Sequence, residues 1–290
     1  MAIIIIDGFK VYSSLDGAKS IIVNSECINE SMRVFTENNL DGVAITTSHD
    51  YRLQNVDFLS EYPEIKHLSV SEGISDVNAI HTLKNLDSLM LSGKNRKVDF
   101  SKFPLLTDLI ADWSPHFLNM DKCTNLRRLA FYHYNPKSKD CTSLSNVPWI
   151  QRLKITQSPI RSLNGLERFS QLKELEFNYC SKLEALCCLE ESSETLNSLR
   201  FDYCKSIKNH EYVTLLDHLN ELAYNDGGII PSIKFIKKMP ALKKFMFVGT
   251  DVTDGDMTHC LGLTYAGFSN KRHFSHTMEQ IKALSLQQNN

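Results

Sequence analysis

The side chains that most often do chemistry are spread along this sequence without forming a known motif. Among ten His and eight Cys, His273 and His276 lie three residues apart, and Cys187 and Cys188 are adjacent. Two His at that spacing can bind a metal ion, but no Cys or carboxylate at ligand spacing accompanies them. The two cysteines are not a CxxC pair, and apolar residues flank them, so packing is the better interpretation. We therefore predict no metal site and no redox site.

Motifs for phosphate, calcium or catalysis are also missing. Gly227 and Gly228 are not followed by the Lys and Ser or Thr of a phosphate loop. Asp251, Asp254 and Asp256 lack the glycine and the terminal glutamate of a calcium loop. No cluster of acid, base and nucleophile stands out. We therefore expect no catalytic residue, no cofactor and no enzymatic activity, and a hydrolase with an unrecognised site is the less favoured alternative.

The composition is that of a packed, soluble protein. The 290 residues are 42% hydrophobic, 9% aromatic and 23% charged, which excludes a disordered tail, a collagen and a membrane bundle. With 32 Lys and Arg against 34 Asp and Glu, the formal charge is -2. Because no global basic field exists, we expect neither nucleic acid nor a membrane as a partner.

The cysteines and the start of the chain bear on the cellular compartment. The apolar run over residues 1–6 lacks a basic flank and is too short for a signal peptide, so we expect it to form a strand. The eight cysteines follow no regular disulfide framework, which favours free thiols and a reducing compartment. We therefore expect a cytoplasmic location.

One spacing pattern organises the chain: an apolar residue, two variable residues, an apolar residue, one variable residue and a third apolar residue. Its eleven copies start 20 to 25 residues apart, at Leu40, Ile65, Leu86, Leu106, Leu126, Ile150, Leu172, Leu196, Leu219, Leu242 and Leu263. In each copy the fourth and sixth positions point inward along a short strand, while the third, fifth and seventh point outward. Because one such repeat cannot bury its apolar side alone, we expect stacked strands that share one core.

This pattern resembles the leucine-rich repeat family over residues 40–275. The stretch 153–175 is similar to the short repeats of internalins, and the stretches 175–183 and 199–207 look like the cysteine-containing subclass. The resemblance implies an α/β fold, a leucine-rich repeat solenoid or horseshoe with a parallel sheet on the concave face and short helices or turns on the convex face. It also implies that the protein binds other proteins. Whether the convex segments are α-helical or 3₁₀ stays open.

The ninth position of each repeat is expected to turn inward and cap backbone groups. Six of the eleven residues there are small polar residues or thiols, namely Ser48, Ser114, Ser158, Cys180, Cys204 and Thr250. Lys94, Tyr134 and Lys271 do not fit this set. We expect the turn to depart from the norm in their repeats.

Both ends of such a solenoid need a cover, because an open end exposes the core and the edge of the sheet. We expect an N-terminal cap over residues 1–39, with a hairpin, a helix that begins near Ser25 and, as an open possibility, a degenerate repeat. The repeats occupy residues 40–275, and a cap helix with a polar tail occupies residues 276–290. We expect no linker or second domain between them.

The outward positions of the middle repeats form the candidate site. We predict that partner binding uses Asp112, Trp113, Arg128, Tyr132, His133, Arg152, Lys154, Glu176, Tyr179, Arg200, Asp202, Tyr203 and Asp226. Neighbouring strands lie about 4.8 Å apart, so these side chains form one patch, and Trp, Tyr and Arg are enriched at interface hot spots. The alternative is that this face only keeps the solenoid soluble and that pairs such as Arg152 with Glu174 satisfy each other. We favour binding, because the exposed aromatic residues, Trp113 among them, exceed what solubility needs.

These observations predict a non-catalytic protein that engages another protein through its concave face. Two roles fit a repeat protein without an effector domain. One is an inhibitor, such as an immunity protein that occludes a toxin, and the other is an adaptor or substrate-receptor scaffold. Neither the partner nor the oligomeric state follows from the pattern.

Overall fold

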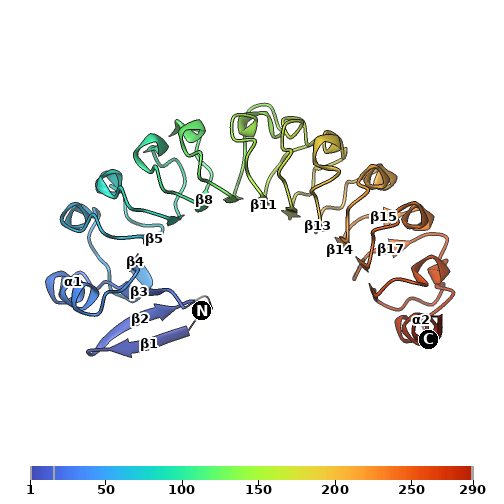
Figure 1. Ribbon diagram of the computed structural model, residues 1–290, viewed down its shortest axis with the longest axis horizontal. Coiled ribbons are helices and arrows are strands. Elements are labelled where there is room, and N and C mark those ends of the chain that lie inside the picture. Colours follow the sequence, from blue (N-terminus) through green and yellow to red (C-terminus); the bar gives the residue numbers. More distant parts are fainter. Residues whose placement is uncertain (1, 16, 289–290) are drawn as a thin grey trace. The chain divides into compact units, whose positions relative to one another are not determined.

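The computed structural model describes residues 2–15 and 17–288. The chain forms two compact units, Met1–Leu129 (unit 1) and Ala130–Asn290 (unit 2). Within each unit, short strands stack side by side, and each is followed by a turn on the side away from the sheet (Figure 1). This is the arrangement expected when repeats with one apolar side share a core.

Unit 1 contains strands, one α-helix and short 3₁₀ turns. Its strands are β1 (Ala2–Ile6), β2 (Phe9–Ser13), β3 (Lys19–Ile22), β4 (Gly42–Ile45), β5 (His67–Val70), β6 (Ser88–Leu91), β7 (Val98–Asp99), β8 (Asp108–Asp112) and β9 (Phe117–Leu118). Its helices are α1 (Ile28–Glu37) and the 3₁₀ turns η1 (Thr47–His49), η2 (Asp57–Glu61), η3 (Asn78–Thr82), η4 (Phe100–Lys102) and η5 (Met120–Lys122). Strand β10 (Arg128–Tyr132) begins in unit 1 and ends in unit 2.

Unit 2 repeats the same alternation. Its further strands are β11 (Arg152–Thr156), β12 (Glu174–Asn178), β13 (Ser198–Asp202), β14 (Glu221–Asn225), β15 (Ile229–Ile230), β16 (Lys244–Met246), β17 (Asp251–Val252) and β18 (Tyr265–Gly267). Its helices are η6 (Thr142–Leu144), η7 (Glu190–Ser192), η8 (His210–Leu215), η9 (Lys234–Lys238), η10 (Met257–Cys260) and α2 (Met278–Gln288).

The sheet of unit 1 starts antiparallel and continues parallel. β1 pairs with β2 across a two-residue turn at Asp7 and Gly8, whose φ angles of 48° and 86° match the twist of a tight hairpin. β3 pairs antiparallel with β2 and parallel with β4, with Ile21 opposite Val43. β4, β5, β6 and β8 then follow in parallel order.

The sheet of unit 2 confirms the repeat period. β11, β12, β13 and β14 are parallel neighbours, and their register places Leu153, Leu175, Leu199 and Leu222 side by side. All four are fourth positions of the predicted repeats, and all four are buried. β14 continues to β16 and then to β18 in the same direction. The predicted parallel sheet with an apolar inner side is therefore present.

The segments on the outer side of the repeats are 3₁₀ turns rather than α-helices. Each of η2 to η10 is three to six residues long, and two short parallel pairs, β7 with β9 and β15 with β17, join outer segments of neighbouring repeats. Within the internalin-like stretch 153–175, residues 159–171 form turns and a single bridge from Ser162 to Ala185, without a 3₁₀ helix. Among the described residues, no helix is long and apolar enough to span a bilayer.

The ninth positions cap backbone carbonyls, as expected, in four repeats of unit 2. Ser158, Cys180, Cys204 and Thr250 are buried, and each donates its side-chain hydrogen to a carbonyl of the preceding repeat. The acceptors are the carbonyl oxygens of Tyr134, Ile155, Phe177 and Tyr224, respectively. Tyr134, at the ninth position of its repeat, also turns inward, because its ring is buried, but its hydroxyl lies 2.6 Å from Ser143 Oγ of the same repeat.

In the repeat that contains Lys94, a residue other than the ninth occupies the inner capping position. Lys94 is exposed, and the side chain of Arg96, only 9% exposed, occupies the inner position instead. Its guanidinium donates to the carbonyl oxygens of Ser71, Ile74 and Ser92. Gly93 leaves room for it, since a Cβ there would lie 2.8 Å from a guanidinium nitrogen. An arginine therefore caps three carbonyls where a small polar residue caps one.

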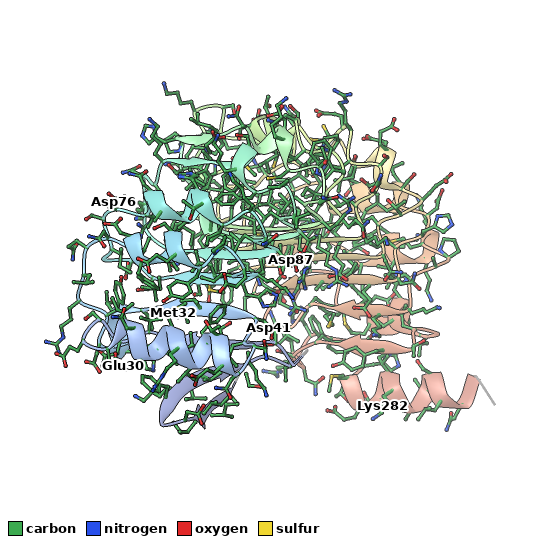
Figure 2. The ribbon with its side chains drawn as sticks, turned by 60° about the vertical axis from the view of Figure 1, so that its left-hand side comes forward. Glu30, Met32, Asp41, Asp76, Asp87 and Lys282 are labelled. Carbon is green, nitrogen blue, oxygen red and sulfur yellow. The ribbon has the colours of Figure 1, made fainter. Side chains whose placement is uncertain are left out.

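The helix α1 covers one side of β3 in unit 1. Met32 on this helix is buried, whereas Glu30 is exposed (Figure 2). The helix begins at Ile28, three residues later than predicted. Ser25 does not cap it, because its hydroxyl donates to the carbonyl of Asp50 and accepts from the backbone N–H of Arg52.

Candidate functional site

The strands of unit 2 present rows of side chains on the outward side of the sheet. The parallel register puts Arg152 opposite Glu174 and Lys154 opposite Glu176, so equivalent positions of successive repeats are neighbours. With strands about 4.8 Å apart, each row is continuous. We call the outward side chains at positions three, five, seven and eight of the repeats in unit 2 its strand face.

The eighth positions have an unusual backbone conformation. His133, Gln157, Tyr179, Tyr203 and Asp226 all lie in the left-handed region, with φ between 45° and 57°. The backbone N–H of each donates to the carbonyl of the seventh residue of the next repeat, at N···O distances of 2.7 to 2.9 Å. This conformation costs about 1–2 kcal/mol for a residue other than glycine. The row of backbone hydrogen bonds therefore holds these five residues in place.

The two tyrosines of this row form an exposed aromatic pair. Tyr179 and Tyr203 stack with ring centroids 4.4 Å apart and planes 4° from parallel. They are 52% and 37% exposed. The carboxylate of Asp226, next in the row, raises the pKa of the Tyr203 hydroxyl, and Tyr179 adds to the effect. The pair is thus a rigid apolar surface with a negative charge at one end.

The charged residues of the strand face are paired with one another. Arg152 lies 3.2 Å from Glu174, and Lys154 lies 3.1 Å from Glu176. Within β13, Arg200 Nε lies 2.7 Å from an Asp202 carboxylate oxygen. The pairing proposed for Arg152 and Glu174 is therefore correct. These charges surround the tyrosines as a largely neutral polar frame, and such exposed pairs add little stability.

The seventh positions belong to the same face, although the predicted site omitted most of them. Asn225 Nδ2 donates to Asp202 at 2.9 Å, and its Oδ1 accepts the backbone N–H of Val248 at 3.0 Å. Thr156 Oγ1 and Asn178 Oδ1 are buried polar atoms for which no hydrogen-bond partner is found within residues 2–15 and 17–288. Their place in the outward row is the signal in the sequence that marks them. The predicted site instead favours aromatic and charged side chains over short polar ones.

Tyr132 and His133 extend the strand face at β10. Tyr132 is 39% exposed, and His133 is half-buried. The structure thus gathers ten of the thirteen predicted residues in unit 2. They are Tyr132, His133, Arg152, Lys154, Glu176, Tyr179, Arg200, Asp202, Tyr203 and Asp226.

The other three predicted residues lie in unit 1. Asp112 accepts the backbone N–H of Gly93 at 2.7 Å, and Arg128 lies 2.6 Å from Asp108. Trp113 was predicted to be exposed, but it is half-buried. The next residue, Ser114, is buried.

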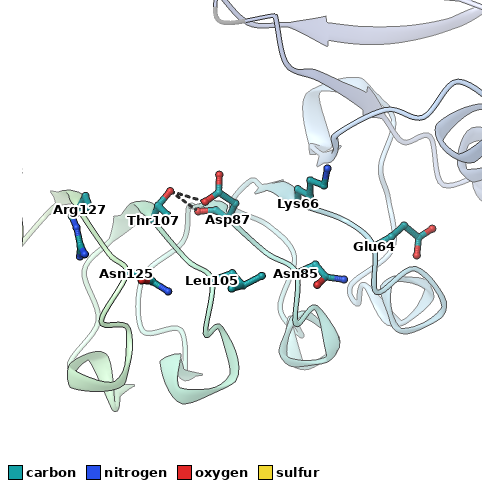
Figure 3. A pocket seen from close by; sticks show the side chains of 8 residues that line it. All are labelled: Glu64, Lys66, Asn85, Asp87, Leu105, Thr107, Asn125 and Arg127. Carbon is teal, nitrogen blue, oxygen red and sulfur yellow. Dashed lines mark hydrogen bonds between the residues drawn. The ribbon is translucent and has the colours of Figure 1, made fainter.

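Unit 1 also carries an open groove of about 700 Å³ where the chain enters its strands (Figure 3). The lining residues are Glu64, Lys66, Asn85, Asp87, Leu105, Thr107, Asn125 and Arg127. Thr107 Oγ1 donates to Asp87 Oδ1 at 2.7 Å, and the amides of Asn85 and Asn125 donate to proline carbonyls of the preceding repeats. These polar groups join neighbouring repeats, so we assign the groove a structural role.

The histidines and adjacent cysteines are engaged in hydrogen bonds. His273 Nε2 lies 3.1 Å from the carbonyl of Val252, and His276 Nδ1 lies 3.0 Å from Ser275 Oγ. Both precede α2, so no helix aligns their rings. In the part of the chain that the structure describes, no cluster of His, Cys, Asp and Glu side chains could hold a metal ion.

The thiols of Cys187 and Cys188 both donate to Asn164 Oδ1, at 3.2 and 3.5 Å. Burial and the neighbouring Cys187 raise the pKa of Cys188. The reactive thiolate form of Cys188 is therefore disfavoured.

Comparisons with known proteins match this geometry. No protein-family model and no curated protein matches the chain. A leucine-rich repeat protein from Leptospira interrogans has a similar structure, with a TM-score of 0.57 and 13% identity over 87% of this chain and 71% of that one. The internalin InlF from Listeria monocytogenes gives a TM-score of 0.53 and 18% identity over 87% of each chain.

At these identities the likeness concerns the fold. The buried fourth positions and the parallel strands of this chain belong to the same fold. The chain is therefore a leucine-rich repeat solenoid.

Proposed function

We propose that this chain binds another protein through the strand face of unit 2, with Tyr179 and Tyr203 at the centre of the contact. The observation that carries the proposal is the exposed stack of these two rings, held by backbone hydrogen bonds at left-handed positions. Tyrosine is enriched among residues that dominate binding energy. Because the rings are already ordered, little conformational entropy is lost when a partner covers them.

The paired charges around the tyrosines suit a second role in the same contact. Each of these charged side chains already has an ion-pair partner within the chain: Arg152 with Glu174, Lys154 with Glu176, and Arg200 with Asp202. Such charges contribute to specificity and association rate more than to affinity. We therefore propose that they select the partner, while the tyrosines supply most of the affinity.

The test is affinity purification with the intact protein, followed by measurement of Kd for the partner recovered. Tyr203→Ala should weaken binding roughly 30-fold, because a central aromatic anchor is worth about 2 kcal/mol or more. Tyr265→Ala is the matched control, since Tyr265 is also an exposed tyrosine on the strand face of unit 2 but lies on β18 at the end of the sheet, three strands away from β13, which precedes Tyr203. It should leave Kd unchanged.

Three results count against the proposal. Equal loss of binding in both variants would show that Tyr203 is not at the centre of the contact. Unchanged binding in Tyr203→Ala, with loss only after substitutions on the outer turns, would place the contact elsewhere. Recovery of no stoichiometric protein partner, together with turnover in a substrate screen, would favour an enzyme. Trp113→Ala tests separately whether unit 1 takes part, because its indole remains partly accessible.

The finer role is also open to test. Of the two roles, we propose an inhibitor of the immunity-protein kind rather than an adaptor, and assay of the partner's activity with and without this chain separates them. We further propose a cytoplasmic location. Cys180 and Cys204, as buried thiols that donate to backbone carbonyls, support a reducing compartment.

A further inference from the structure

The first strand of unit 1 is an unprotected sheet edge. Among the described residues, β1 is the terminal strand of its sheet and pairs with β2 on one side only (Figure 1). Its sequence is Ala followed by four Ile, and Ile3 and Ile5 are 50% and 64% exposed. Soluble proteins usually protect such an edge with a charge, a proline, a bulge or a covering helix. At the end of unit 2, for comparison, α2 packs against β18.

The hairpin geometry shows which backbone groups face the open edge. Ile6 and Phe9 flank the two-residue turn and lie opposite each other. In a hairpin of this kind the flanking pair exchanges both backbone hydrogen bonds, and bonded pairs then alternate along the strands. Ala2, Ile4 and Ile6 therefore bond to β2. The N–H and C=O groups of Ile3 and Ile5 point away from it.

We propose that a second copy of this chain pairs with β1, antiparallel and about a two-fold axis at Ile4. In that register Ile3 of each copy lies opposite Ile5 of the other. Both residues have outward backbone groups, so each Ile3–Ile5 pair exchanges two hydrogen bonds, and every group left open by β2 is satisfied. An antiparallel strand is self-complementary in this way, which is the requirement of a symmetric dimer.

The side chains favour the same partner. Pairing brings the exposed Ile3 and Ile5 of both copies together on one face of the joined sheet. No charged residue lies between Ala2 and Ile6, so two copies meet without repulsion. A charged partner strand would have to place its charges against isoleucines, whereas a second copy of β1 places isoleucine against isoleucine.

The contact is small. Pairing two five-residue strands covers less than the roughly 1,200 Å² of a stable interface. The dimer should therefore be weak and should form in proportion to concentration. This surface lies in unit 1 and does not depend on the strand face of unit 2.

Sedimentation velocity on the full chain tests the proposal, over concentrations from low micromolar to near millimolar. The wild type should show a reversible monomer–dimer equilibrium. Ile5→Lys should raise the dimer Kd at least tenfold, because an edge lysine blocks strand addition. Leu15→Lys is the matched control, since Leu15 is fully exposed in the turn after β2 and the chemical change is the same. It should dimerise like the wild type, and circular dichroism should show both variants folded.

A cysteine substitution tests the register. Ile4→Cys places a thiol opposite its own copy, at the Cβ separation of about 4.5–5.5 Å typical of non-bonded pairs. It should form an intermolecular disulfide mapped to residue 4, whereas Lys10→Cys on β2 should not. Monomer at every concentration, a dimer that survives Ile5→Lys, equal loss in Leu15→Lys, or no residue-4 crosslink at dimerising concentrations would each overturn the proposal.

Discussion

Replacing Arg96 by Met should destabilise unit 1 more than any exposed substitution. The guanidinium is buried, and its Nε donates to the carbonyl of Ser92 at 2.9 Å. One terminal nitrogen donates to Ser71 at 3.1 Å, and the other donates to Ile74. Burial lowers the pKa of Arg96, and the nearby carboxylate of Asp112 opposes that shift. The site therefore holds a charged side chain through its hydrogen bonds.

The magnitude follows from what the carbonyls lose. Each buried acceptor left without a donor costs about 1–3 kcal/mol, so three of them set an upper limit of about 9 kcal/mol. Methionine also removes a buried charge, and relief of that desolvation returns several kcal/mol. We expect a net loss of about 3 kcal/mol in the free energy of unfolding. Arg96→Lys should recover less than half of it, because one ammonium cannot replace a forked donor.

Urea unfolding followed by circular dichroism measures these differences. Arg168→Met is the control, since Arg168 is exposed and the same chemical change there should stay within about 0.5 kcal/mol. If the two units unfold separately, only one transition should shift with Arg96→Met. A loss below about 1 kcal/mol, or an equal loss in Arg168→Met, would refute the assigned capping role of this arginine.

Two further outcomes follow from unit 2. Thr250→Val keeps the shape of the side chain but removes its bonds to Tyr224 and Gly227, so the free energy of unfolding should fall by about 1–3 kcal/mol, while exposed Thr253→Val should change little. Burial lowers the pKa of His210 below the unfolded value, so its contribution to stability is complete above about pH 6.5 and is lost as the pH falls toward the folded pKa. His210→Phe should flatten this part of the curve of melting temperature against pH, and an unchanged slope would exclude His210 as its source.

The strand register could be predicted from the sequence because it depends on a period. Fourth positions such as Leu153 and Leu175 recur at repeat spacing, and a strand with one buried face leaves them a single register. The type of helical turn in the outer segments could not be predicted in this way. A segment of this length can bury its aliphatic residues as one helical turn of either type, so the choice of 3₁₀ over α depends on neighbouring repeats.

The sequence could not predict that Arg96, rather than Lys94, occupies the inner capping position of its repeat. The pattern marks Lys94 as a misfit, but the remedy depends on backbone geometry. Gly93 has φ of 107° and no Cβ, and only that combination lets the arginine fold back against its own turn. The repeat period therefore shows that the ninth position, Lys94, does not fit the capping pattern, but it does not show that Arg96 caps the carbonyls instead.

Some features of the candidate site could likewise be predicted from the sequence, and others could not. Outward rows and the Arg152–Glu174 pair follow from alternation and register. The stacking of Tyr179 on Tyr203 does not, because it needs both residues in the left-handed region, which bulky side chains rarely adopt.

The left-handed backbone at the eighth positions bears on why Tyr179 and Tyr203 occupy them. Two repeats after Tyr203, the same position is Gly249, which adopts φ of 72° without strain. A glycine or asparagine at positions 179 and 203 would satisfy the same backbone hydrogen bonds at lower conformational cost. Stability alone therefore does not select tyrosine at either place. Since strained residues persist where a function uses them, the two rings are better explained by what they present to a partner than by what they contribute to the fold.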